Sequence, residues 1–185
     1  LKNCYNVQGY YYSPDSVMNL LKNVPNKYET ITLHTTQDYL DICEYIQHSA
    51  SVFGININIE ISSPAIHRKI FSSSESSFFR ASWIGDYPDP ENFLSLFYSK
   101  NSPNGPNYTD FYNTKYDSLY ERSFEFSSFN RCVLFEEMES ILIDEAVVIP
   151  LYYDYAVRLV AKDIEGMSIN AMNSLSLKRV NKKNK

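Results

Sequence analysis

An alternating run of isoleucine and polar residues occupies positions 55–61, which read ININIEI. Single polar residues separate the four isoleucines, so all four side chains lie on one face of an extended chain. Positions 30–35, TITLHT, alternate in the same way, and positions 78–84, FFRASWI, form a third apolar run. The sequence therefore predicts three β-strands within the first half of the chain.

Segments with a helical spacing of apolar residues separate these strands. Ser13-Pro14, Ser63-Pro64 and Asp89-Pro90 each place a capping residue before a proline, which is typical of a helix start. Helices are predicted over residues 14–24, 37–53, 64–71, 91–99, 115–124 and 128–145, and a last strand over 147–153. Because strands that alternate with helices need crossover connections, the predicted fold class is α/β, with a mixed, mostly parallel sheet flanked by helices.

The composition suits a globular domain and argues against some classes of partner. The chain has 185 residues, is 44% hydrophobic and carries a net charge of −5, so a nucleic-acid partner is not expected. No apolar run approaches the roughly 20 residues of a membrane-spanning helix. The basic C-terminal tail is interpreted as a solvated terminus, with a membrane or nucleic-acid contact as the alternative. The 16 tyrosines and 11 phenylalanines fit either a codon bias or an aromatic-lined pocket.

The three cysteines, Cys4, Cys43 and Cys132, form no C-x-x-C pair and no zinc-binding pattern. Cys43 and Cys132 lie in helical patterns and are interpreted as small, buried apolar residues. Neither a metal nor another cofactor is predicted. The chain begins without methionine and without the apolar segment of a signal peptide, so we expect a piece of a longer protein.

No catalytic motif accompanies the three histidines. The chain contains neither a G-x-S-x-G nor an H-E-x-x-H pattern. His48 and His67 are expected on the surface, and His34, at the end of a strand, is the best of the three as a catalytic candidate. Asp86 with Asp89 or with Glu91 could imitate the carboxyl pair of a glycosidase, although Asp89 is better explained as a helix cap. We predict no catalytic residue and keep hydrolysis as an alternative.

The segment RASWIGDYPDP, residues 80–90, follows the third predicted strand at its carboxyl end. Ligands of open α/β sheets bind beyond the carboxyl ends of strands. Trp83 offers a flat apolar wall, Asp86 a charge for a cationic group, and Gly85 a close approach of the backbone. The alternative interpretation makes Asp86 a capping residue of the turn that follows.

Extended to RASWIGDYPDPENFLSLF, the same segment resembles the signature of the oligopeptide-binding protein family, the receptors of peptide ABC transporters. The shared pattern is an apolar strand, then W-x-x-D-[YN], then D-P-x-x-F. Further segments resemble other parts of that family, in the same order along the chain: YYYSPDSVMNLLKN (10–23), VFGININIEI (52–61) and residues 116–160 with their IPLYY stretch. The resemblance covers nearly the whole chain.

The resemblance implies a function and a set of site residues. In that family the carboxylate at the position of Asp86 receives the α-amino group of an extended peptide, and the tryptophan, here Trp83, lines a side-chain pocket. Arg80 is expected near the carboxylate end of the ligand, and Gly85 and Tyr87 complete the predicted ligand-binding set. The implied partners are peptides and an ABC permease in the inner membrane, with no cofactor. Members of that family can carry a further basic residue at the end of the helix before the tryptophan strand. Phe71 lies at about that position in this chain, so the preferred peptide length stays open.

The resemblance also implies how the chain is divided and where it works. Residues 1–155 are expected to form part of a C-terminal ligand-binding lobe, and residues 156–185 to form terminal strands that return toward a missing first lobe, with a basic tail. The expected location is the periplasm or the cell envelope, and a lipid anchor on the full-length protein stays open. With half of the cleft missing, this piece should bind peptides weakly or not at all. A docking module without ligand is the further alternative.

Overall fold

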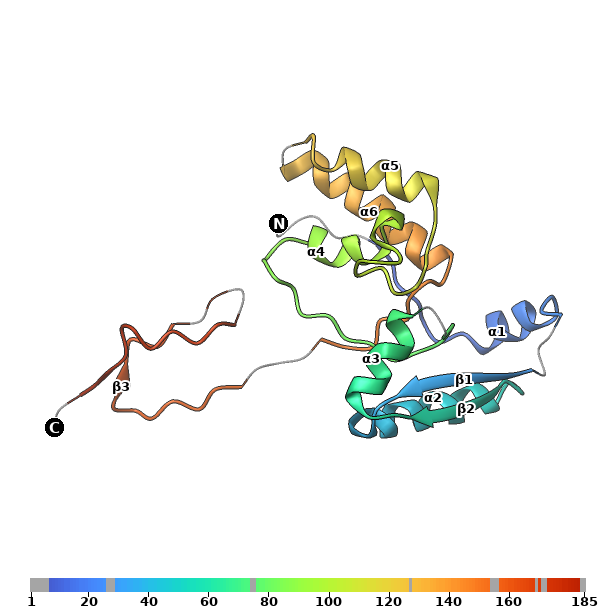
Figure 1. Cartoon of the computed structure of the whole chain (residues 1–185), viewed down its shortest axis with the longest axis horizontal. Helices are drawn as coiled ribbons and strands as arrows, with labels where there is room; N and C mark the ends of the chain where they lie inside the picture. The colour runs from blue at the N-terminus through green and yellow to red at the C-terminus, as the bar shows by residue number, and fades with distance from the viewer. Residues whose placement is uncertain are drawn as a thin grey trace.

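The computed structural model describes residues 7–25, 29–73, 76–126, 128–153, 157–168, 170 and 173–183. Figure 1 shows a lower layer with the main sheet, an upper layer of helices α4, α5 and α6, and a C-terminal arm that stands apart from both. The loop between α3 and α4, which contains the predicted site, connects the lower layer to the upper one (Figure 1).

Two parallel strands form the main sheet. β1 (Thr30–Thr35) pairs with β2 (Asn56–Ile61), in a register that places Leu33 opposite Ile59. Between them run a 3-10 turn, η1 (Gln37–Tyr39), and helix α2 (Leu40–Ser51). Gly54 follows this helix with a φ of 75°, a left-handed backbone that glycine adopts without strain. The predicted parallel order and the α/β fold class are therefore confirmed.

The third predicted strand is present only at its start. His34 donates its backbone N–H to the Phe78 carbonyl (3.1 Å) and accepts from the Arg80 N–H (2.9 Å), which gives one parallel bridge between His34 and Phe79. The prediction of a strand over 78–84 is wrong beyond Arg80, because the chain there leaves the sheet and is held by α4 instead. β1 consequently lies between β2 and the segment around Phe79.

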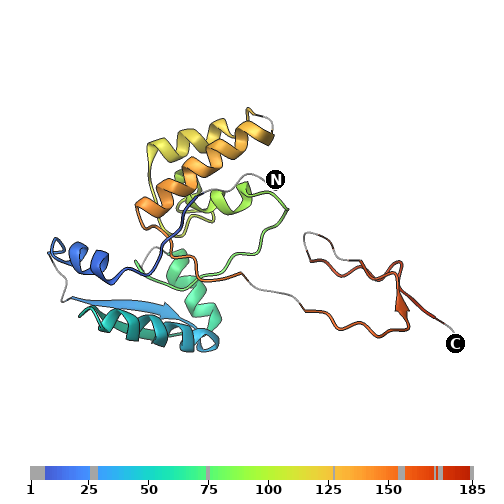
Figure 2. The same cartoon turned by 180° about the vertical axis from the view of Figure 1, so that it is seen from behind.

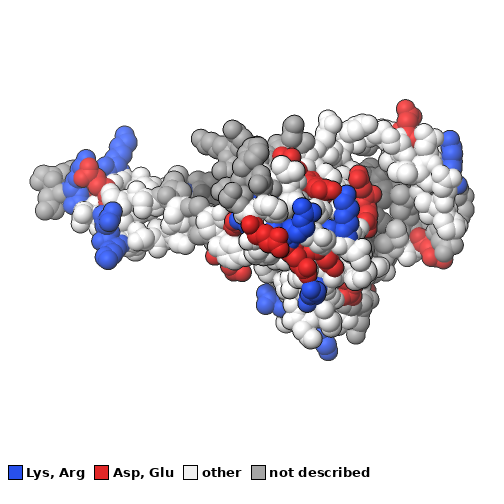
Figure 3. Space-filling model, turned by 90° about the horizontal axis from the view of Figure 1, so that it is seen from above, with Lys and Arg blue, Asp and Glu red and all other residues white. Residues whose placement is uncertain are grey.

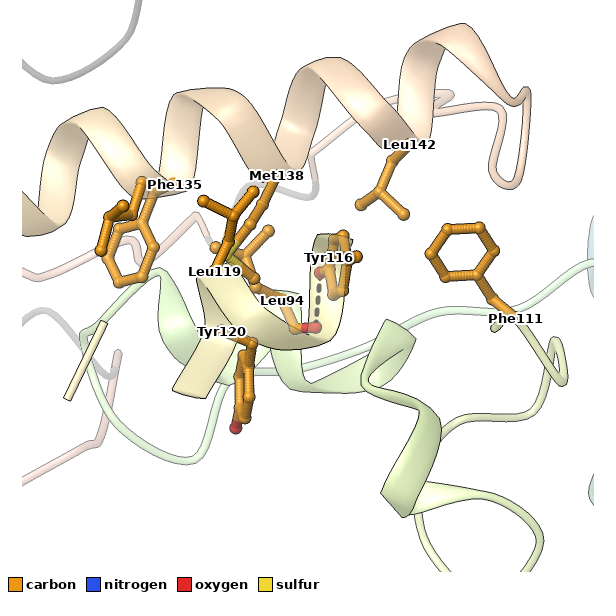
Figure 4. Close-up of a cluster of buried hydrophobic side chains, with 9 residues drawn as sticks. Leu94, Phe111, Tyr116, Leu119, Tyr120, Phe135, Met138 and Leu142 are labelled. Carbon is orange, nitrogen blue, oxygen red and sulfur yellow. Dashed lines mark hydrogen bonds between the residues drawn. The ribbon is translucent and has the colours of Figure 1, made fainter. Parts of the chain in front are cut away.

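The helical layer contains the main apolar core. It comprises α4 (Glu91–Leu94), the 3-10 turns η2 (Ser95–Phe97) and η3 (Ser99–Asn101), α5 (Thr114–Arg122) and α6 (Ser128–Asp144). Buried side chains from α4, α5, α6 and the loop before α5 meet in one cluster, which consists of Leu94, Phe111, Tyr116, Leu119, Tyr120, Leu134, Phe135, Met138 and Leu142 (Figure 4). The Tyr116 hydroxyl donates to the Leu94 carbonyl at 2.7 Å and so joins α5 to α4.

Two local signals set the ends of these helices. The Asn113 side chain accepts hydrogen bonds from the N–H groups of Lys115 and Tyr116, so it caps α5. The helix predicted over 91–99 is shorter than expected, since α4 ends at Leu94 and the chain continues as 3-10 turns. The other predicted helices agree with α1 (Pro14–Leu21), α2, α3 (Pro64–Ser72), α5 and α6 in place, with shifted ends.

The strand predicted over 147–153 is wrong. The segment has strand-forming residues, yet it pairs with no strand of the described chain and its large side chains are exposed, Tyr153 at 88%. The preference of a residue for β-strands reflects how well its side chain packs against neighbouring strands. A segment with such residues therefore forms no strand when no neighbouring strand is available. The apolar side of α1 is uncovered in a similar way, with Leu20 at 69% exposure and no buried residue in the helix.

The C-terminal arm contains a short antiparallel pair, β3 (Ile164–Glu165) with β4 (Asn181–Lys182) (Figures 1 and 2). Its basic residues are partly neutralised, because Lys182 lies 3.5 Å from Asp163 and Lys183 lies 2.7 Å from Glu165. On the face seen in Figure 3, acidic and basic side chains are intermixed over the body of the molecule. The interpretation of the tail as a solvated terminus stays a prediction.

Both cysteines of the described helices are buried, as expected. Cys43 in α2 carries a free thiol. Cys132 in α6 is disulfide-bonded, so its interpretation as a simple apolar residue is wrong. In the described part of the chain, no helix has the length and apolarity to cross a membrane, and no three side chains are grouped to hold a metal ion.

Candidate functional site

The loop from Ala81 to Pro90 carries four of the five predicted site residues, and α4 holds it in place. Trp83 is half-buried and Asp86 is exposed. The Asn92 side chain, at only 4% exposure, accepts two hydrogen bonds through its Oδ1 atom. One comes from the Trp83 indole N–H at 2.8 Å and the other from the Asp86 backbone N–H at 3.2 Å. The fold therefore brings Trp83 and Asp86 together through a residue that the sequence did not single out.

The Asp86 carboxylate has no hydrogen bond or ion pair with any described residue, although its backbone is fixed. The turn that follows is capped by Asp89 instead, whose Oδ1 accepts from the Glu91 N–H at 3.0 Å. The structure thus gives the capping role to Asp89 and leaves the Asp86 carboxylate open to solvent. Such a carboxylate can accept an ammonium or another donor without first losing a partner.

Asp89 also joins this loop to α6. The Arg131 guanidinium donates to both Asp89 oxygens, at 2.9 and 3.2 Å, and its Cζ lies 4.9 Å from the centroid of the Phe135 ring. Both ends of the ion pair are partly buried, at 24% and 30% side-chain exposure. A two-point contact of this kind fixes direction as well as distance. The start of α4 is therefore anchored to α6.

A tyrosine–carboxylate cluster anchors the other end of the loop. Buried Glu91 accepts hydrogen bonds from the Tyr87 and Tyr120 hydroxyls, one to each carboxylate oxygen. The hydrogen bond to Glu91 raises the pKa of Tyr87, and burial raises the pKa of Tyr120, with the bond to Glu91 adding to it. Both phenols stay protonated as donors, and Tyr87 is tied to the helical layer through Glu91.

Arg80 occupies a different place from the other four. Its backbone belongs to the sheet edge, and its guanidinium Cζ lies 3.1 Å from the centroid of the Tyr39 ring. No hydrogen bond or ion pair joins Arg80 to Trp83 or Asp86 within the described chain. Stacking on Tyr39 holds the guanidinium by its flat face and leaves its N–H edge free to donate.

Gly85 packs against α4. A Cβ atom at this position would lie 3.3 Å from Phe93 Cε2 and 3.4 Å from both Asn92 Oδ1 and the Tyr87 carbonyl. The absence of a side chain thus allows the loop to approach α4, whereas the sequence suggested an approach to a ligand. The two explanations are compatible, because one side of the Gly85 backbone faces α4 and the other side stays available to a ligand.

The three histidines have different surroundings. His67 is buried, so its expected surface position is wrong; its Nε2 lies 2.7 Å from the Arg80 carbonyl and its ring packs edge-on against Phe71. His48 is exposed, as expected. His34 Nδ1 lies 3.8 Å from Glu60. Because Asp89 is bound to Arg131 and Glu91 to two tyrosines, neither is a free carboxyl group that could pair with Asp86.

Comparisons with known proteins give the relationships of the chain. No family model matches it. The dipeptide-binding protein DppE of Bacillus subtilis is 27% identical over 155 residues, which is 83% of this chain and 28% of that protein. The oligopeptide-binding protein OppA of the same organism is 33% identical over 101 residues, 54% of this chain and 18% of that protein. The homologues of this chain are peptide-binding proteins.

A third homologue, the periplasmic murein peptide-binding protein MppA of Escherichia coli, is 27% identical over 155 residues, 81% of this chain and 28% of that protein. This chain thus spans less than a third of the length of these peptide-binding proteins. The family resemblance seen in the sequence is confirmed.

Solved structures of peptide-binding proteins have a similar fold. The ABC transporter-associated periplasmic binding protein DppA of Helicobacter pylori, in complex with peptide STSA, has a TM-score of 0.80 at 22% identity, over 97% of this chain and 36% of that one. The dipeptide-binding protein of Pseudoalteromonas sp. SM9913, in complex with Met-Leu, has a TM-score of 0.75 at 20% identity, over 93% and 36%. The chain therefore has the fold of part of a periplasmic peptide-binding protein.

Proposed function

We propose that this chain is part of a peptide receptor of an ABC importer, and that the Trp83–Tyr87 loop and Arg80 form its contribution to the ligand site. The homologues are named for dipeptides, oligopeptides and murein peptides, which share an ammonium group and a peptide backbone. The observation that carries the proposal is the exposed Asp86 carboxylate, which has no partner among the described residues and lies beside Trp83 on a loop fixed by Asn92.

The proposed chemistry is recognition of features that all peptides share. Asp86 accepts hydrogen bonds from the α-ammonium group, a charge-assisted contact of about 1.5–3 kcal/mol. Because the backbone at Asp86 is already ordered, little conformational entropy is lost when the ammonium arrives. Trp83 supplies an apolar wall for a neighbouring side chain, which accommodates many residue types.

Arg80 supplies the complementary charge. The proposal assigns its N–H edge to the carboxylate end of the ligand, since the Tyr39 ring covers only the face of the guanidinium. Gly85 and Tyr87 shape the loop, through close packing on α4 and the bond to Glu91. Metal ions and cofactors have no part in this binding mode.

The remaining parts of the proposal concern the whole receptor. Residues 1–155 contribute the ligand-binding part, and residues 156–185 run toward a first lobe that closes over the ligand. The receptor works in the periplasm or cell envelope and passes peptides to a permease in the inner membrane. A disulfide at Cys132 supports an oxidising compartment of this kind. A lipid anchor belongs to the same hypothesis.

The test is Asp86→Asn in the full-length receptor that carries this chain, with binding of trialanine and N-acetyl-trialanine measured by calorimetry. The substitution keeps the shape and removes the charge, so free-amine trialanine should bind about 10- to 150-fold more weakly. The acetylated peptide should bind poorly to the native receptor and lose little more. Asp15→Asn, which removes an exposed carboxylate from α1, is the matched control. Equal binding of both peptides by native and Asp86→Asn receptors would refute the proposal.

A further inference from the structure

The loop that carries Trp83 and Asp86 has no regular secondary structure, yet one buried side chain holds two of its donors. Asn92 Oδ1 accepts from the indole of Trp83 and from the backbone of Asp86, nine and six residues earlier in the chain. A carboxamide oxygen has two lone pairs, so one atom can satisfy both donors. Asn92 itself is fixed by α4, where its backbone N–H donates to the Asp89 carbonyl at 3.1 Å.

We propose that Asn92 is a positioning residue of the peptide site, which sets the orientation of the Trp83 indole and of the Asp86 backbone before a ligand binds. This inference rests on the proposed function for its ligand, but the orientation itself is a property of the chain alone. Asn92 touches no ligand in this scheme and acts through its hydrogen bonds to Trp83 and Asp86, while its side chain also contacts the Tyr87 phenol.

The arrangement has a consequence for specificity. Because the indole N–H is bonded to Asn92, the Trp83 side chain has no donor left for a ligand and presents only carbon. The backbone N–H of Asp86 is also occupied, so Asp86 offers only acceptor oxygens. This part of the site therefore takes an ammonium group together with an apolar side chain, or with a side chain of any kind that lies flat on the ring.

The chemistry of the side chain predicts which substitutions preserve the arrangement. Aspartate has nearly the same shape as asparagine and keeps an acceptor oxygen, whereas leucine fills a similar volume without any acceptor. A hydrogen-bonding role therefore predicts that Asn92→Asp retains the orientation of Trp83 and that Asn92→Leu loses it. A role in packing alone predicts the reverse, because the leucine variant would then fill the site and the aspartate variant would bury a charge.

The first experiment uses this chain, in which Trp83 is the single tryptophan. Acrylamide quenching and fluorescence anisotropy decay report on the exposure and mobility of that indole. Asn92→Leu and Asn92→Ala should increase quenching and shorten the anisotropy decay, and Asn92→Asp should leave both as in the native chain. Asn107→Ala is the matched control, because Asn107 is also a buried amide, which donates to the Tyr98 and Phe111 carbonyls instead.

The quenching results distinguish a hydrogen-bonding role of Asn92 from a packing role. Native quenching in both Asn92→Leu and Asn92→Ala would overturn the inference, and so would an equal increase in Asn107→Ala. Far-UV circular dichroism identifies variants that fail to fold. If Asn92→Leu is among them, Asn92→Ala supplies the comparison, and increased quenching in a folded Asn92→Asp variant would also overturn it.

The second experiment measures trialanine binding by the full-length receptor that carries this chain. Loss of the ordered loop in Asn92→Leu should weaken binding about tenfold, because the ligand must then order groups that were already in place. Asn107→Ala should bind as the native receptor does. If the native receptor binds no peptide, the proposed function fails while the quenching results still decide the role of Asn92. If peptide binds equally to native and Asn92→Leu receptors, the inference fails while the proposed function stands.

Discussion

Tyr87 and Tyr120 donate to the same buried carboxylate from different environments, which allows a matched pair of substitutions. Each phenylalanine variant deletes a single hydroxyl group from the Glu91 cluster and leaves the ring in place. Tyr120 is 8% exposed, so its deletion leaves Glu91 short of a donor where water has little access. Tyr87 is 45% exposed, so water can replace its hydroxyl at the carboxylate.

The expected magnitudes follow from this difference. A hydrogen bond to a charged group contributes about 1.5–3 kcal/mol when nothing replaces it, which is the expected cost of Tyr120→Phe. With about 2–4 °C per kcal/mol for a chain of this size, the melting temperature should fall by roughly 3–12 °C. Tyr87→Phe should cost about 0.5 kcal/mol or less, since surface substitutions rarely exceed that range.

Urea unfolding of the 185-residue chain, followed by far-UV circular dichroism, measures both free energies. Tyr112→Phe is a suitable control, because that tyrosine is 72% exposed and lies outside the Glu91 cluster. The reasoning is refuted if the two variants lose equal stability, or if Tyr87→Phe loses more. Either result would mean that burial of the phenol does not determine the cost of removing its hydroxyl from Glu91.

Two further predictions concern the loop and the pH dependence. Gly85→Ala places a methyl group 3.3–3.4 Å from Phe93, Asn92 and the Tyr87 carbonyl, so it should cost about 1 kcal/mol and increase quenching of Trp83; Gly9→Ala, which meets nothing within 4 Å, should do neither. A native stability in Gly85→Ala would show that the loop can move away from α4. Burial, with a smaller effect of the nearby Glu136 charge, raises the pKa of Glu139. Ionised Glu139 is therefore less favourable in the folded chain than in the unfolded chain, and the folded chain loses stability as the pH rises from the ordinary carboxyl pKa through the raised one. Glu139→Gln should therefore raise the urea midpoint at pH 7 and give no gain below the ordinary carboxyl pKa of 4.5, whereas exposed Glu125→Gln should change little at either pH. A gain that is independent of pH would contradict this cause.

The sequence alone determined the features that depend on near neighbours in the chain. The period-2 pattern of 55–61 and the period of 37–53 identified β2 and α2, because each residue's side of a strand or helix is set by its local spacing. The capping residue before Pro90 and the glycine after α2 are local as well. The W-x-x-D pattern marked the loop as a candidate site, although it said nothing of how the loop is held.

Only the tertiary structure decided the features that depend on distant partners. The segment 147–153 has the composition of a strand but no described neighbour to pair with, and 81–84 leaves the sheet although its residues suit a strand. His67 is buried, and its Nε2 lies at the carbonyl of Arg80, 13 residues further along the chain at the sheet edge.

The candidate site shows the same division. Its loop is held by Asn92, by Arg131 across 42 residues and by Tyr120 through a carboxylate 29 residues away. Such contacts form only when separate helices and loops pack together, so the spacing of residues within one segment of the sequence does not predict them. The sequence identified the exposed side chains that are candidates for ligand binding, and the packing of α4 against α5 and α6 determined the positions of those side chains.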